Sequence, residues 1–258
     1  MPAPAYAVVI IQKFLYKEPL KEYGFTFKNV SWKHFFLSPV FYLAFVFLTM
    51  GIVYLLGNLF HVSGFGEISF AVENVTKKII ELAKGKIDTS QMNVPPPLLL
   101  FILGVAGGMT SGAIFNFPFT LGEELGWRGL LLKELQSLGF WKSNLLIGTI
   151  WGLWHMPIIL MGHNYPHYPI IGSIMMVPFC ISISFIQSIL RLRSATVFAP
   201  SVFHGMLNGG APITLIYIVN NNELVGSIVG IAGISAALII TGLYLLADKK
   251  FILQYREL

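Results

Sequence analysis

Charged residues are scarce in this sequence of 258 residues, because Lys, Arg, Asp and Glu together make up only 11% of it. A soluble domain typically contains about 25% charged residues. Five long stretches contain no such charge at all: 34–66, 89–122, 143–190, 194–222 and 224–247. A helix of about 20 apolar residues spans the core of a bilayer, and each stretch is longer than that. The composition excludes a soluble globular protein and predicts a multi-pass integral membrane protein, in the cell membrane if the source is prokaryotic.

Two residue types are nearly absent, and each absence excludes a class of protein. Cys180 is the only cysteine and lies inside an apolar stretch, so the chain is not a disulfide scaffold. Asp88 and Asp248 are the only aspartates and both lie outside the predicted spans, which excludes a membrane protease built on two aspartates. The net charge is +5, but in a chain this apolar the expected partner is the lipid bilayer and not a nucleic acid.

The apolar stretches predict helices and not the strands of a membrane barrel. Barrel strands alternate polar and apolar residues, whereas segments such as 98–103 and 228–246 are apolar throughout. A helix satisfies its own backbone hydrogen bonds inside a bilayer. We therefore expect an all-α, single membrane-embedded domain over 1–258, with spans near 37–57, 97–115, 143–162, 168–190, 195–219 and 224–247. Segments 1–16 and 119–136 are ambiguous, and the bundle has about eight transmembrane helices if both cross.

The connection over 58–96 is the one long loop between predicted spans. Within it, apolar residues recur at helical spacing, at Phe70, Val72, Val75, Ile79 and Leu82. This pattern predicts an amphipathic helix. It either lies on the membrane surface or packs on the rest of the bundle.

The first polar group among the apolar segments is 122–129, with the sequence GEELGWRG. An ionisable residue inside a span is costly and is by default a hypothesis for a functional site. Glu124 and Arg128 are four residues apart, which places them on one helix face as an ion pair. Glu123 is then an acid beside a neutralised pair. In an alternative interpretation, Thr120 and Glu123 form a capping box and Glu123 is only structural.

Two further polar groups lie in later spans. His155 follows two tryptophans in 151–155, and His204 and Asn208 share one helix face. Each has a structural alternative, namely a buried core histidine or a hydrogen bond between helices worth about 1 kcal/mol. Together with Glu123, however, they supply a base for water and donors for an oxyanion, which is what peptide hydrolysis requires.

Other catalytic patterns of membrane proteases are missing. The sequence contains no H-E-x-x-H zinc motif. The segment 108–112, GMTSG, has one residue too many for a G-x-S-G serine motif, and Cys180 has no histidine near it in sequence. The set of one glutamate, two histidines and one asparagine remains.

At these residues the sequence resembles the CAAX protease and bacteriocin-processing family, the intramembrane glutamic proteases related to the Ras-converting CAAX endopeptidase. The family pattern is E-E-x-x-x-R, then F-x-x-x-H, then H-x-x-x-N. Residues 123–128 and 204–208 match the first and last motifs, and 151–155 match the middle one with Trp151 in place of Phe. The resemblance covers about 97–220, which we expect to be the catalytic core.

The resemblance implies an eight-helix membrane core with its site inside the bilayer. Glu123 and His155 would bind and activate the attacking water, and His204 and Asn208 would stabilise the oxyanion. Glu124 and Arg128 would support them. The resemblance favours a mechanism with no metal and no other cofactor.

The sequence therefore predicts an intramembrane endopeptidase that hydrolyses a peptide bond in a membrane-anchored substrate. The expected reaction is CAAX-type removal of the C-terminal tripeptide after a prenylated cysteine. One alternative is a zinc-dependent version with Glu123, His155 and His204 as ligands, as in catalytic His₂Glu zinc sites. Another is a non-catalytic immunity or scaffold protein in which the polar residues hold helices together. A transporter is disfavoured because no pair of interrupted helices occurs in matching halves.

Overall fold

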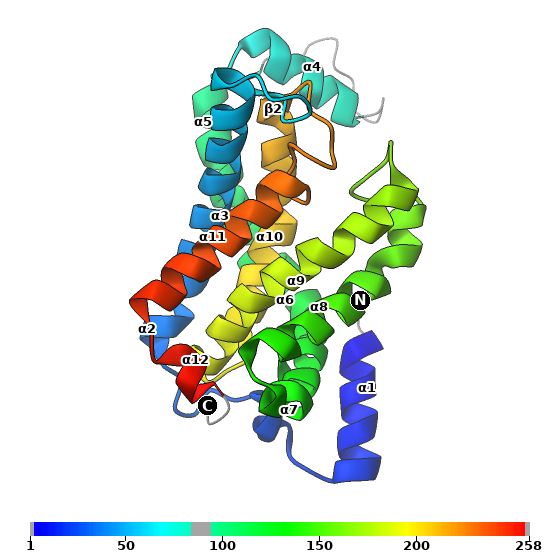
Figure 1. The fold of residues 1–258 in the computed structure, drawn as a ribbon, viewed down its shortest axis with the longest axis vertical. Coiled ribbons are helices and arrows are strands. Elements are labelled where there is room, and N and C mark those ends of the chain that lie inside the picture. The colour runs from blue at the N-terminus through cyan, green and yellow to red at the C-terminus, as the bar shows by residue number, and fades with distance from the viewer. Residues whose placement is uncertain (1–2, 84–93, 256–258) are drawn as a thin grey trace.

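The computed structural model describes residues 3–83 and 94–255, and this part of the chain is almost entirely helical (Figure 1). Strands β1 (Glu67–Ile68) and β2 (Ile218–Val219) have two residues each and pair antiparallel, with Glu67 opposite Val219. The predicted all-α class is confirmed.

The N-terminal third contains one long apolar helix. Helix α3 (Leu37–Val53) continues into the π-helical segment η3 (Tyr54–Leu59). The shorter elements around it are α1 (Ala3–Ile11), η1 (Gln12–Tyr16), η2 (Leu20–Tyr23), α2 (Trp32–Phe35) and α4 (Val72–Ala83). Predicted span 37–57 thus corresponds to α3 and η3.

A helical run of 42 residues carries the first motif. It consists of α5 (Pro97–Ser111), η4 (Gly112–Asn116), α6 (Phe117–Glu124), η5 (Leu125–Leu131), α7 (Leu132–Leu135) and η6 (Gln136–Leu138). The predicted span 97–115 and the ambiguous segment 119–136 are therefore joined without a loop. Pro118 is tolerated because it lies in the first turn of α6, just after π-helical η4. The second π-helical segment, η5, begins directly after Glu124, and such segments are frequent at functional sites.

The described part of the C-terminal half consists of five helices: α8 (Phe140–Leu160), α9 (Pro169–Ser194), α10 (Phe198–Tyr217), α11 (Ile231–Ala247) and α12 (Phe251–Gln254). The first three match predicted spans to within a few residues. The predicted start at 224 is wrong, because α11 begins at Ile231. Backbone hydrogen bonds from Val225 and Gly226 to the Asn222 carbonyl form turns there instead.

Four helical stretches of the described residues are long and apolar enough to cross a membrane: Trp32–Leu59, Pro97–Leu138, Phe140–Leu160 and Pro169–Ser194. Two shorter apolar helices cover Ala3–Tyr16 and Ile231–Ala247. Large apolar side chains such as Leu103 and Ile174 are exposed on the helix surfaces, as expected where lipid is the solvent. The chain is an integral membrane protein.

Helix α10 runs through the middle of the bundle and contacts α3, α5, η4, α6 and α9 (Figure 1). Glycines allow the closest of these approaches. A Cβ atom on Gly112 would lie 2.3 Å from the Met206 Cα, and one on Gly205 would lie 2.3 Å from the Gly112 carbonyl oxygen. The backbones of η4 and α10 therefore touch one residue from His204, and this contact sets the position of the third motif.

Helix α4 is the amphipathic helix predicted in the 58–96 connection, of which 84–93 lie outside the described residues. It lies at one end of the bundle, opposite α7 and α12 (Figure 1). Val75 is completely buried and α4 contacts α10, whereas Val72, Ile80 and Leu82 are exposed. The helix thus packs on the bundle by one face and leaves other apolar side chains at the surface.

Candidate active site

The three motifs lie on three segments that meet around one cavity. Glu123 is at the end of α6, His155 is in α8, and His204 and Asn208 are in α10. All four side chains line a cavity of about 730 Å³. Residues separated by up to 85 positions in sequence are therefore brought to one space.

Glu123 is buried, with 2% of its surface exposed. Its Oε2 accepts a hydrogen bond from Trp151 Nε1 at 3.3 Å. The capping-box interpretation is wrong, because α6 begins at Phe117 and has no side-chain cap. The Thr120 hydroxyl instead donates to the Ser201 carbonyl of α10 at 2.9 Å. Glu123 is thus free of any structural role at the helix start.

Glu124 and Arg128 form the predicted ion pair, at 3.2 Å, and neither side chain has any exposed surface. Further hydrogen bonds come from α9: Gln187 donates to Glu124 Oε1 at 3.2 Å, and Arg128 donates to Ser184 at 2.8 Å. A buried charge needs such partners, because its hydration is lost. The sequence pattern indicated the pair but not the contribution of α9, where the only signal was polar residues within an apolar span.

His204 is held by the same carboxylate. Its Nδ1 lies 2.8 Å from Glu124 Oε1. Since a carboxylate only accepts hydrogen bonds, Nδ1 carries the hydrogen and Nε2 is left for another partner. Asn208 lies one turn further along α10, exposed in the cavity. The two side chains therefore offer polar groups to the same space.

His155 is oriented by its own helix. Its Nδ1 lies 2.9 Å from the Trp151 carbonyl oxygen, so Nδ1 is the donor and Nε2 of the neutral ring is an acceptor. Cys180 Sγ is 4.0 Å from the same Nδ1. Cys180 has no histidine near it in sequence, and only the packing of α9 on α8 places the two together.

Apolar side chains line the cavity throughout, and charged side chains join them at the end that is far from the motifs. Phe119, Met176 and Leu207 are among its apolar lining residues. At the other end it is lined by Lys78 and Glu81 of α4, and by His163, His167 and Glu223 from two loops. His167 Nδ1 lies 3.2 Å from Glu223 Oε2. The cavity thus extends from the buried carboxylates to the end of the bundle where α4 lies.

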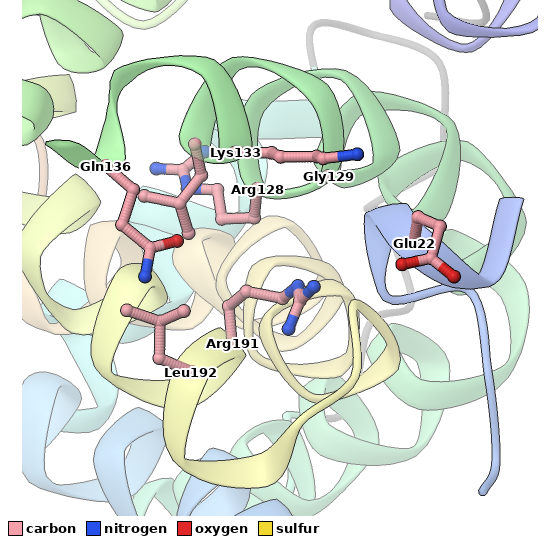
Figure 2. Close-up of a pocket in the computed structure, with 8 residues that line it drawn as sticks. Glu22, Arg128, Gly129, Lys133, Gln136, Arg191 and Leu192 are labelled. Carbon is pink, nitrogen blue, oxygen red and sulfur yellow. The ribbon is translucent and has the colours of Figure 1, made fainter. Parts of the chain in front are cut away.

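A second, smaller pocket of about 200 Å³ involves Arg128 and shares no lining residue with the first (Figure 2). Lys133, Arg191 and Glu22 also line it. A Cβ atom on Gly24 would lie 2.3 Å from the Arg191 Cζ, and Gly24 has a φ of +79°. Only glycine is suited to this position, because it tolerates both the positive φ and the guanidinium. Arg128, Lys133 and Arg191 together make this pocket basic.

No three His, Cys, Asp or Glu side chains among the described residues are arranged to hold a metal ion. Of the three ligands considered from the sequence, His204 binds Glu124 through Nδ1, and Glu123 binds Trp151 through one oxygen. Nε2 of His204 and Oε1 of Glu123 take no part in these hydrogen bonds, so the metal-free mechanism stays a prediction.

Comparison with known proteins identifies relatives for the central part of the chain. Residues 93–210 match the family described as type II CAAX prenyl endopeptidase Rce1-like. A segment of 46 residues is 44% identical to CAAX prenyl protease 2 of Methanococcus maripaludis, and covers 17% of this chain and 17% of that relative. No solved structure matches. The family match contains all three motifs, which confirms the resemblance.

Proposed function

We propose that this protein is an intramembrane endopeptidase that removes the C-terminal tripeptide after a prenylated cysteine of a membrane-anchored substrate. One observation carries the proposal: Glu123, His155, His204 and Asn208, from three separate helices, line a single cavity. Residues that only hold helices together would face separate interfaces. The match of residues 93–210 to an endopeptidase family supports the same reaction.

Water activation is assigned to Glu123 and His155. Trp151 occupies one oxygen of Glu123, and Oε1 makes no hydrogen bond to another described residue. A water in the cavity can donate one hydrogen to Glu123 Oε1 and the other to His155 Nε2. As the water oxygen attacks the peptide carbonyl carbon, Glu123 takes its proton. When the C–N bond breaks, that proton passes to the leaving nitrogen, and the tripeptide departs as a free amine.

His204 and Asn208 are assigned to the oxyanion of the tetrahedral intermediate. The Asn208 amide is a neutral donor, and His204 donates from Nε2 when both ring nitrogens carry hydrogen. Glu124 then balances the charge of the ring and holds it in place through Nδ1. Donors held in position before the reaction stabilise the intermediate without reorganisation. Arg128 supports this arrangement by fixing Glu124.

A prenylated peptide fits the character of the cavity. Small-molecule sites are commonly about 300–1,000 Å³ with apolar walls and a few polar groups, and this cavity is about 730 Å³. The apolar wall that includes Phe119, Met176 and Leu207 suits an isoprenoid chain. The motif residues at the buried end suit the peptide bond.

The test is cleavage of a farnesylated CAAX peptide by the purified protein in lipid vesicles, with the released tripeptide measured by mass spectrometry. The Glu123→Gln variant should lose activity by at least about 10³-fold, since it lacks the base. Glu134→Gln is the matched control, because Glu134 lies on the same helical run but is exposed. Equal activity of wild type and Glu123→Gln would disprove the assigned base. No cleavage by either, with the protein folded, would favour the non-catalytic alternative.

A further inference from the structure

Trp151 contacts four of the groups assigned above, namely Glu123, His155, Arg128 and His204, and its ring centre lies 5.2 Å from that of the His204 ring. Its Nε1 donates to Glu123 Oε2 at 3.3 Å, and its carbonyl accepts from His155 Nδ1 at 2.9 Å. The Arg128 Cζ lies 4.7 Å from the centre of the indole ring, within the range of a cation–π contact. Trp151 is itself buried, with 3% of its surface exposed.

The indole N–H is the contact that matters most for Glu123. It is the only hydrogen bond to this carboxylate from the described residues. The motif pattern has Phe at position 151, and a phenyl ring has no hydrogen-bond donor. A Phe here would leave both carboxylate oxygens unpaired in an apolar, buried place, which is costly.

We infer that Trp151 is a positioning residue, whose indole N–H holds Glu123 in the orientation in which the other carboxylate oxygen meets the attacking water. This inference rests on the proposed function. It predicts two effects when the N–H is removed. Glu123 gains rotational freedom, which lowers the rate slightly, and its carboxylate form becomes less stable relative to the protonated acid, which moves the acid limb of the pH dependence.

Other ionisable groups also surround Glu123: Glu124 of α6, Arg128 of η5, His155 of α8, Cys180 of α9 and His204 of α10. Helix α1 and segment η4 also pack on α6, and the one ionisable side chain that they carry, Tyr6, is exposed. The Trp151→Phe variant retains all of them. It also retains an aromatic ring beside Arg128 and the backbone carbonyl that binds His155. The variant removes one hydrogen-bonding group, the N–H donor, and it also makes the ring smaller, a change that Trp154→Phe shares.

The experiment compares the pH dependence of kcat/KM for wild type, Trp151→Phe and Trp154→Phe on the farnesylated peptide. The acid limb of Trp151→Phe should move to higher pH by about one unit, which corresponds to about 1.4 kcal/mol. The plateau should stay within about threefold of wild type. If Trp151 only supported the packing of the helices, Trp151→Phe would lower the plateau of kcat/KM without moving its acid limb.

Trp154→Phe is the matched control for this measurement. Trp154 lies one turn along α8 and its ring contacts the His155 ring at 5.0 Å, but its indole N–H makes no hydrogen bond to another described residue. Its acid limb should coincide with that of wild type. An unmoved limb in Trp151→Phe, or an equal movement in both variants, would overturn the inference.

A second readout does not depend on activity. In protein labelled with ¹⁵N-tryptophan, the signal missing from Trp151→Phe identifies the Trp151 indole among the five tryptophans. This signal should move upfield in Glu123→Gln, because the donor then faces a neutral amide in place of a carboxylate. An unchanged signal would show that the contact does not exist, whether or not the protein cleaves the peptide. A moved signal in a protein that does not cleave the peptide would confirm the contact and contradict the proposed function.

Discussion

The ion pair of Glu124 and Arg128 allows a quantitative test of how buried charge stabilises this fold. Both side chains are fully buried and their charged atoms are 3.2 Å apart. Removing one partner of such a pair typically costs about 3–5 kcal/mol, because the other charge is left without compensation. Glu124 retains donors from His204 and Gln187, which reduces the cost. For Arg128→Met we therefore expect a loss of about 3 kcal/mol in the free energy of unfolding.

The double variant Glu124→Gln/Arg128→Met separates charge from packing. It removes both charges, so it should recover at least half of the stability that Arg128→Met loses. It should nevertheless be inactive, because His204 no longer has a carboxylate on Nδ1. Stability is measured by denaturant titration in detergent micelles, followed by tryptophan fluorescence, and activity by cleavage of the farnesylated peptide.

A surface pair provides the control for this series. Lys133 pairs with Glu18, and their side chains are 36% and 40% exposed. Lys133→Met should cost less than about 1 kcal/mol. Two results would contradict this account of the buried ion pair. One is an Arg128→Met variant that is no less stable than Lys133→Met, and the other is a double variant that is as unstable as Arg128→Met alone.

Three further predictions concern the oxyanion, the helix contact and the metal. Asn208→Ala should lower kcat by roughly 10²–10³-fold with little change in KM, because a donor to the intermediate is lost; an unchanged kcat would remove Asn208 from the site. Gly112→Ala should destabilise the protein by about 1–3 kcal/mol, because its Cβ would lie 2.3 Å from the Met206 Cα. A Cβ on Gly107 would meet nothing within 4 Å, so Gly107→Ala should be close to neutral in the same unfolding measurement. Chelators should leave cleavage unchanged, and a loss of activity that zinc restores would instead support the zinc-dependent alternative.

The helices and their membrane location could be predicted because both follow from local composition. A long apolar stretch must satisfy its own backbone hydrogen bonds in a bilayer, and only a helix does so within one segment. The i,i+4 spacing of Glu124 and Arg128 predicted their ion pair for the same reason. Local pattern left segment 119–136 open, and it forms one helical run with 97–115. The predicted start at 224 was wrong, because α11 begins at 231.

The motifs predicted which residue types form the candidate site, but they did not predict the contacts between those residues. Three contacts join different helices: Glu124 binds His204, Trp151 donates to Glu123, and Cys180 lies near His155. No spacing rule within one helix predicts such contacts. They depend on how deeply the helices approach one another and at which register.

Composition and spacing thus establish a helical membrane protein and the polar side chains that its apolar segments contain. Only the packing of the helices brings those side chains to one cavity, because Gly112 and Gly205 let η4 and α10 approach at their backbones. This approach places His204 against Glu124 and leaves Glu123, His155 and Asn208 around the same space.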